Sequence, residues 1–238
     1  MQMAERSNII WTDATWNPVT GCSKVSQGCK FCYAERLAKQ LQAEGSHRYR
    51  NSFQVTLHPD VLDLPLPWKT PKRVFVNSMS DLFHVDVPDD FIAKVFGIML
   101  KAPQHTFQIL TKRPERVVAM ANDLSWADNI WMGTSIENDQ VVGRADLLRH
   151  VPARVRFLSC EPLIGPLPSL HLEGIHWVIV GGESGPGHRP IKEAWVEDIR
   201  GRCEELGIPF LFKQWGGDTP KSGGRLLHGR TWDGIPDW

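Results

Sequence analysis

Three cysteines that could bind a metal together lie within eleven residues near the start of the sequence. Cys22, Cys29 and Cys32 have the spacing C-x6-C-x2-C, and a glycine precedes each of the first two. Glycine lets the backbone approach a bulky inorganic group closely, and a C-x2-C pair can direct both sulfurs to one metal site. There is no fourth cysteine nearby. Because iron–sulfur clusters are held by thiolates, this spacing predicts a [4Fe–4S] cluster with one iron open to another ligand.

The spacing alone leaves two other interpretations open. Structural zinc usually has four protein ligands, and a distant histidine such as His47, His58 or His84 could complete a Cys3His site. The three cysteines could also be unrelated buried thiols. A disulfide framework is not expected, because the chain is long, contains only five cysteines and shows no signal peptide.

The composition is that of a globular protein with one large domain. Over 238 residues, Lys plus Arg and Asp plus Glu number 27 each, so no global basic field favours nucleic acid. No apolar run is long enough to cross a membrane, which predicts a cytoplasmic protein with reduced thiols. The ten tryptophans are expected mainly in the core, although stacking on a nucleobase substrate is an alternative.

Strand-like and helix-like segments alternate through the middle and end of the sequence. Short runs rich in Val, Ile and Phe are typical of buried parallel strands. We expect strands at residues 17–20, 73–77, 106–110, 130–133, 155–159, 177–180 and 210–212. We expect helices at residues 34–44, 89–101, 140–149 and 192–206, and another from residue 114. This alternation predicts an α/β protein whose parallel sheet is covered by helices.

Nearly every predicted strand ends in a cluster of polar residues. In a barrel these ends meet at one mouth, whereas an open sheet needs such ends only near its switch point. We therefore predict a single domain over residues 1–238, built as a partial (βα) barrel of about six to seven parallel strands. Residues 45–72 are expected to form an irregular insertion. Residues 217–238 are expected to form an irregular tail that acts as a lid or packs against the barrel.

An aromatic residue, Phe31, stands directly before the last of the three cysteines. This segment resembles the cysteine triplet of the radical S-adenosylmethionine (SAM) superfamily, although six residues rather than the usual three separate the first two cysteines. Longer segments resemble a narrower, phage- and bacteria-associated family of radical-SAM-like proteins. These segments are residues 16–22, 32–35, 159–163, 181–185 and 212–216.

The resemblance implies a partial βα barrel, a [4Fe–4S] cluster bound by the three cysteines, SAM as second cofactor and an external electron donor. The substrate would be a small molecule or a nucleic acid, and a genetically associated partner protein is a further expectation. The abundant tryptophan and the basic run at residues 47–50 favour a nucleic-acid substrate, whereas the neutral net charge opposes tight duplex binding. The alternative function is a zinc-binding or non-catalytic interaction protein on the same barrel.

The resemblance also implies roles for the residues that follow the strands. Contacts to SAM are expected from Phe31, Tyr33, Asn77, Ser78, Asp81, Lys112, Arg113, Ser135, Glu137 and Asn138. The aromatic residues would lie by the adenine, the group at residues 77–81 by the amino group, the two cations by the carboxylate, and the group at residues 135–138 by the ribose. Contacts to substrate are expected from Glu183, Gln214 and Trp215. Glu161 and Lys213 are the catalytic candidates, with a structural buried pair as the equal alternative.

Cys160 lies between two polar residues at the end of a predicted strand. Side chains alternate between the two faces of a strand, so Ser159 and Glu161 are expected on one face and Cys160 on the other. We therefore expect Glu161 to face the site. Cys160 is expected to be a small buried residue rather than a thiol that returns hydrogen to a substrate radical.

Overall fold

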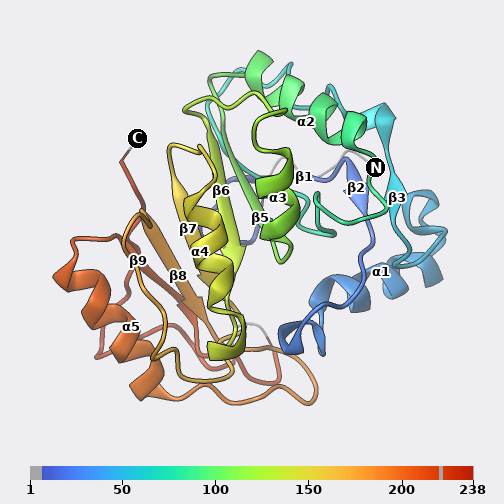
Figure 1. The fold of residues 1–238 in the computed structure, drawn as a ribbon. Helices are drawn as coiled ribbons and strands as arrows, with labels where there is room; N and C mark the ends of the chain where they lie inside the picture. Colours follow the sequence, from blue (N-terminus) through green and yellow to red (C-terminus); the bar gives the residue numbers. More distant parts are fainter. Residues whose placement is uncertain (1–6, 220–221, 238) are drawn as a thin grey trace.

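Seven parallel strands form a curled sheet with the shape of half a barrel (Figure 1). The computed structural model describes residues 7–219 and 222–237. The order across the sheet is β1-β4-β5-β6-β7-β8-β9, and each strand is parallel to its neighbours. The bounds are β1 Ala14–Trp16, β4 Arg73–Val76, β5 Thr106–Thr111, β6 Ile130–Ser135, β7 Arg156–Cys160, β8 Trp177–Gly181 and β9 Phe210–Gln214. The predicted partial barrel is confirmed at this level.

The helices from residue 89 onward follow strands of the large sheet and lie along its outer side, whereas the helix at residues 33–43 lies apart from them (Figure 1). The α-helices are α1 Tyr33–Ala43, α2 Asp89–Lys101, α3 Pro114–Met120, α4 Gly143–Arg149 and α5 Glu193–Glu205. Short 3-10 turns are η1 Gln27–Cys29, η2 His47–Tyr49, η3 Pro59–Val61 and η4 Asp139–Val141. The helix expected at residues 140–149 therefore begins with a 3-10 turn, and the other predicted helices are confirmed to within one residue where both bounds were predicted. Among the described residues, no helix is long and apolar enough to cross a membrane.

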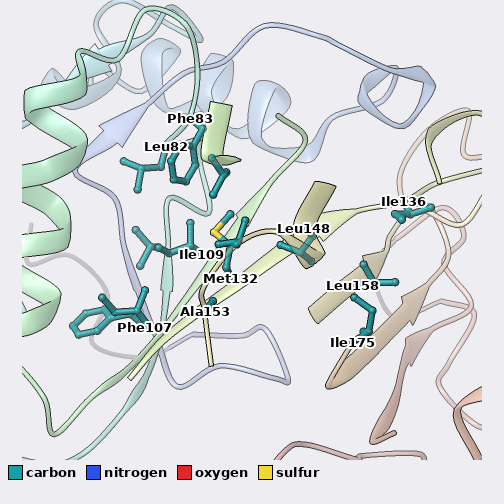
Figure 2. Close-up of a cluster of buried hydrophobic side chains, with 14 of the residues drawn as sticks. Leu82, Phe83, Phe107, Ile109, Met132, Ile136, Leu148, Ala153, Leu158 and Ile175 are labelled. Atoms are coloured by element: carbon teal, nitrogen blue, oxygen red, sulfur yellow. The ribbon is translucent and has the colours of Figure 1, made fainter. Parts of the chain in front are cut away.

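The main core lies between the sheet and its outer helices. Figure 2 shows part of it, with Phe107 and Ile109 of β5, Met132 of β6, Leu158 of β7 and Leu148 of α4 in one buried cluster. These strand residues are fully buried and share one face of the sheet. Burying this face against amphipathic helices supplies the main hydrophobic stabilisation of the fold.

An aromatic floor closes the inner face of the half-barrel near the start of the strands. We define it as Trp11, Trp131, Phe157 and Trp177, which form one buried cluster. The ring of Trp177 lies 6.1 Å from those of Trp11 and Trp131 and 5.5 Å from that of Phe157, centroid to centroid. These tryptophans therefore serve the core, as the composition predicted.

The first strand was predicted wrongly. The sheet begins with β1, residues 14–16, rather than with residues 17–20. Residues 19–20 form β2 (Val19–Thr20), which pairs antiparallel with β3 (Thr56–Leu57) in a separate two-stranded sheet. Pro18 explains the break, because proline has no N–H group and cannot donate a hydrogen bond to a central strand. The apolar Val19 made the second segment look like the strand.

The segment at residues 45–72 contains η2, β3 and η3 and packs beside β1. Trp16 of β1 donates a hydrogen bond from Nε1 to the carbonyl of Val61, at 2.8 Å. Trp68 is buried in the main core, and several leucines of this segment pack against it. Residues 57–68 of the segment therefore pack on the outside of the sheet, whereas the earlier turn η2 contacts α1.

The last described residues pack against β9. The N–H of Phe212 bonds to the carbonyl of Trp232 at 2.9 Å, and the N–H of Gly234 bonds to the carbonyl of Phe210 at 3.0 Å. Trp177 of the aromatic floor also donates from Nε1 to the carbonyl of Gly234, at 2.7 Å. Residues 232–234 thus form a packed tail rather than a lid.

Candidate functional site

A loop that carries all three cysteines lies at the carboxyl ends of the strands. We define the cysteine loop as residues 21–32, which join β2 to α1. Cys22, Cys29 and Cys32 are each half-buried and free of disulfide bonds. Backbone or side-chain groups that follow β4, β5, β6 and β8 bond to this loop or to its flanks. The predicted strand-end clusters therefore converge on the cysteine loop.

Three groups of hydrogen bonds, which we call clamps, connect the strand ends to the cysteine loop. The first clamp joins β4, β5 and Cys22. Asp81 accepts hydrogen bonds from the Thr111 hydroxyl at 2.7 Å, the Lys112 N–H at 3.0 Å and Arg113 Nη1 at 2.9 Å. The same Arg113 nitrogen lies 3.5 Å from the sulfur of Cys22. Burial and the charge of Asp81 raise the pKa of Cys22 to about 11, although Arg113 opposes them. Arg113 is thus placed to stabilise a thiolate at Cys22.

The second clamp lies at the end of β6. Glu137 is fully buried, and its Oε1 accepts hydrogen bonds from the Gly28 N–H at 3.1 Å and from the Ser26 hydroxyl. Its Oε2 accepts a bond from Arg144 Nη1 of α4 at 2.9 Å. Both oxygens of this carboxylate are therefore engaged by protein groups.

The third clamp joins the segment after β8 to the cysteine loop. Glu183 forms a two-pronged pair with Arg189, with N–O distances of 2.9 and 2.6 Å. Burial would raise the pKa of Glu183, but the hydrogen bonds from Arg189 outweigh it and the pKa is lowered. Arg189 also donates to the carbonyl of Gln27 at 3.0 Å, and its guanidinium lies 5.6 Å from the ring centre of Phe31.

Helix α1 is attached at two more points. The Tyr33 hydroxyl donates to the carbonyl of Ser78, which follows β4. Arg36 donates to the carbonyl of Ser184, which follows β8, at 2.8 Å. Together with the three clamps, these bonds hold the cysteine loop and the start of α1 between strands on both sides of the half-barrel.

Glu161 and Lys213 lie on the inner face, at the ends of β7 and β9. Lys213 Nζ is 2.9 Å from Glu161 Oε1, and the Ser159 hydroxyl donates to Glu161 Oε2 at 3.1 Å. The side chains are 14% and 29% exposed for Glu161 and Lys213, so solvent reaches both. A Cβ at Gly181 would lie 2.6 Å from Glu161 Oε1, so glycine at that position makes room for the carboxylate.

The other residues predicted to contact SAM are buried or bonded to other parts of the protein. Asn77 is buried with a positive φ of 61° and bonds through Oδ1 to the Val19 N–H at 3.4 Å. Ser135 is buried at the end of β6, and Asn138 bonds to Gln27 of the cysteine loop at 3.4 Å. The roles proposed for these residues toward SAM stay predictions.

The two predicted substrate contacts on and after β9 are also engaged with protein. Gln214 donates to the Ser184 hydroxyl at 2.8 Å. Trp215 stacks edge-on against Phe212, with ring centres 4.7 Å apart, and bonds to the carbonyl of Leu226 at 2.9 Å. Their roles toward substrate likewise stay predictions.

A cavity of about 930 Å³ opens beside the cysteine loop. Its wall includes Cys22 and Ser23 of the loop, Glu35 and Gln42 of α1, and His84 after β4, together with residues 50–55. Small-molecule sites typically occupy some 300–1,000 Å³. The cavity is therefore large enough for a nucleoside-sized ligand next to Cys22.

The donor set of the cysteine loop fits an iron–sulfur cluster in its chemistry. Three free, half-buried thiols share one loop, whereas Cys160 and Cys203 are buried in the main core. Among the residues that the structure describes, no three His, Cys, Asp or Glu side chains are already gathered as a metal site. Binding would therefore require the sulfurs to turn toward one another.

Sequence reasoning missed the cations that complete the clamps. Arg144 and Arg189 pair with Glu137 and Glu183, and Arg36 bonds to the segment after β8. Arg144 falls inside a predicted helix, where a basic residue is ordinary, so it carried no signal. Residues 185–189 show no sequence pattern that indicates which carboxylate Arg189 pairs with.

Cys160 and Glu161 take the positions that strand alternation predicted. Cys160 is fully buried in the main core, and burial strongly raises the pKa of its thiol. Glu161 pairs with Lys213 on the opposite face. The structure confirms that Cys160 points away from the cysteine loop side of the sheet.

This placement predicts different outcomes for two substitutions. For the SAM chemistry that the resemblance implies, Cys160→Ala should retain most 5′-deoxyadenosine formation, because its thiol lies outside the site, and should cost about 1 kcal/mol of stability for the lost buried atom. Glu161→Gln removes the charged partner of Lys213 and should impair the handling of SAM or substrate, so that product formation falls about tenfold or more. Anaerobic product assays on both variants check this. Loss of activity in Cys160→Ala with wild-type activity in Glu161→Gln would contradict it.

A comparison with known protein families identifies the chain's relatives. The family described as protein of unknown function (DUF5131) matches residues 6–236, nearly the whole chain. The chain belongs to this family. No curated protein and no solved structure matches it. The site therefore has to be interpreted from its own geometry.

Proposed function

We propose that this DUF5131 protein is a radical SAM enzyme. Cys22, Cys29 and Cys32 would bind a [4Fe–4S] cluster, and SAM would be the second cofactor. The observation that carries the proposal is the cysteine loop itself: three free thiols, held at the strand ends by clamps from β4 to β8, beside a cavity of about 930 Å³. Three unrelated thiols would not need a loop that is held in place by contacts from several strands.

Held by Cys22, Cys29 and Cys32, the cluster would supply one-electron reduction of SAM, and SAM would supply the abstraction of a hydrogen atom from the substrate. The chain's own contribution is to orient and shield these groups. Arg113 would stabilise the anionic form of Cys22 from 3.5 Å. The aromatic floor would exclude water from the opposite end of the half-barrel.

The engaged strand ends favour the cavity as the place for SAM. Asp81 and Glu137 already use their oxygens on protein donors, so fewer acceptors remain at the strand ends than the sequence suggested. The cavity wall beside Cys22 includes Glu35, which pairs with Lys24 and Lys39, and the amide of Gln42, whose Nε2 bonds to the Arg50 carbonyl. The amide oxygen of Gln42 would suit an amino or hydroxyl donor of SAM.

Glu161 and Lys213 would act on the substrate. They form the exposed ion pair of the inner face, and such a pair can hold or transfer a proton at Lys213 Nζ or Glu161 Oε1. The substrate is a small molecule or a nucleic acid, and an external electron donor would reduce the cluster.

A zinc site is the second candidate, and one observation favours a particular ligand for it. Of the three histidines considered, His84 lies beside the cysteine loop: its Nε2 is 2.7 Å from the Ser23 hydroxyl, and it lines the same cavity as Cys22. A Cys3His site would then use His84. His58 instead bonds to Thr20, and His47 to Arg50.

Anaerobic reconstitution tests the proposal directly. The protein should bind iron and sulfide, turn brown, and form 5′-deoxyadenosine when SAM and dithionite are added, with or without a substrate. Product and cluster content are measured by chromatography and by metal analysis. The matched control is protein reconstituted with zinc, which should be colourless and inactive. Stoichiometric zinc after aerobic purification, with no iron retained after reconstitution, would favour the His84 site instead.

A further inference from the structure

We propose that Glu137 is a positioning residue that fixes the backbone of the turn carrying Cys29 and holds the Cys29 thiol against Ser26 in the metal-free protein. This inference rests on the proposed function for the metal but concerns the loop itself. Glu137 is the buried carboxylate that bonds to both Ser26, which precedes the turn η1, and Gly28, which lies within the turn directly before Cys29. No other carboxylate among the described residues bonds to the backbone of this turn.

The contact between Glu137 and Gly28 restricts the conformation of the turn η1. Glu137 is 0% exposed, and a Cβ at Gly28 would lie 2.8 Å from its Oε1. The carboxylate therefore fits against a glycine that no larger residue could replace without movement. A charge-assisted hydrogen bond in a buried setting is among the stronger polar contacts in proteins.

A short chain of contacts leads from Glu137 to the sulfur. The Ser26 hydroxyl donates its single proton to Glu137, and the Ser26 oxygen lies 3.9 Å from Cys29 Sγ. With that proton engaged, the Ser26 oxygen can only accept from the thiol of Cys29. Glu137 thus sets both the position of the backbone and the direction in which the thiol points.

Arg144 holds the other oxygen of the Glu137 carboxylate. Its Nη1 lies 2.9 Å from Glu137 Oε2 and 2.9 Å from the Ser135 carbonyl, and its side chain is 8% exposed. The turn is therefore anchored to the sheet through α4 and β6, independently of any bound metal.

Thiol labelling in the metal-free, reduced protein tests the inference without any cluster. Each cysteine's reaction with iodoacetamide is followed by peptide mass spectrometry, and Cys32 serves as the internal reference. Glu137→Gln keeps the size of the side chain but sets an amide N–H₂ against one of its donors. It should raise the labelling rate of Cys29 relative to Cys32 about tenfold. Ser26→Ala should raise the same ratio by a smaller factor.

The ratio of the Cys29 and Cys32 labelling rates distinguishes a positioning role of Glu137 from a general effect on stability. If Glu137 only stabilised the fold, both cysteines would label faster together and the ratio would stay constant. Ser26→Ala removes only a hydroxyl and keeps the inference testable if Glu137→Gln does not fold. An unchanged ratio in every folded variant would overturn the inference.

The cluster provides a second, separate readout. In reconstituted Glu137→Gln, the electron paramagnetic resonance spectrum of the reduced protein should shift or broaden. Asp13→Asn should match wild type, because Asp13 precedes β1 and pairs with Arg73 at the start of β4, at the end of the sheet opposite the cysteine loop. A wild-type spectrum in Glu137→Gln would count against the positioning role. If wild-type protein binds no iron while the labelling ratio changes as expected, the proposed function fails and the positioning of Cys29 stands.

Discussion

Replacing Cys22, Cys29 and Cys32 with alanine should reduce the iron bound after anaerobic reconstitution from about four per chain to background. Each single replacement should already prevent stoichiometric loading, because a cluster with two protein thiolates is poorly held. The physical reason is that these are the three half-buried thiols of the cysteine loop, while the remaining two are buried in the core. Iron and acid-labile sulfide are measured per chain.

Cys203→Ala is the matched control for this experiment. It removes a free thiol from α5 that is buried away from the loop, so iron loading should remain at the wild-type level. Full iron and sulfide content in the triple variant would exclude the proposed cluster site. Zinc retained by wild type but lost from the triple variant would support the Cys3His alternative.

Trp177→Ala should cause the largest loss of stability, about 3–5 kcal/mol in the free energy of unfolding. Trp177 is fully buried at the centre of the aromatic floor, between Trp11, Trp131 and Phe157. The substitution would leave a large cavity and remove the hydrogen bond to the carbonyl of Gly234. Urea unfolding monitored by circular dichroism measures the effect.

Trp195 provides a control on the outer side of the protein. It lies on α5, is only partly buried and packs at the margin of the main core. Trp195→Ala should therefore cost clearly less than Trp177→Ala. Equal losses in the two variants would show that the floor does not hold the half-barrel together as described.

The alternation of strands and helices could be predicted because it depends on local patterns. Runs such as residues 130–133 and 177–180 are apolar and short, as fully buried parallel strands are, and the structure has β6 and β8 there. Strand alternation likewise placed Cys160 and Glu161 on opposite faces. The first strand was missed because β1 has only three residues. The prediction placed the strand around the apolar Val19 instead, although Pro18 separates Val19 from β1.

The clamps could not be predicted, because they join residues far apart in the sequence. Ser26 and Glu137 are 111 positions apart, and Arg189 and Gln27 are 162 positions apart. Nothing local to Glu137 shows that its oxygens will be occupied by a loop from the start of the chain. A polar cluster at a strand end indicates a site but not whether its groups face a ligand or another part of the protein.

The packed tail gives β9 a second neighbour. One side of β9 pairs with β8, and Asp233 forms an antiparallel bridge with Leu211 on the other. An open half-barrel would otherwise offer this strand's free N–H and C=O groups to any exposed strand of another molecule, which is a common route to aggregation. The tail thus covers the edge of β9. Substitutions at residues 232–234 would affect the solubility of the protein more than the chemistry at the cysteine loop.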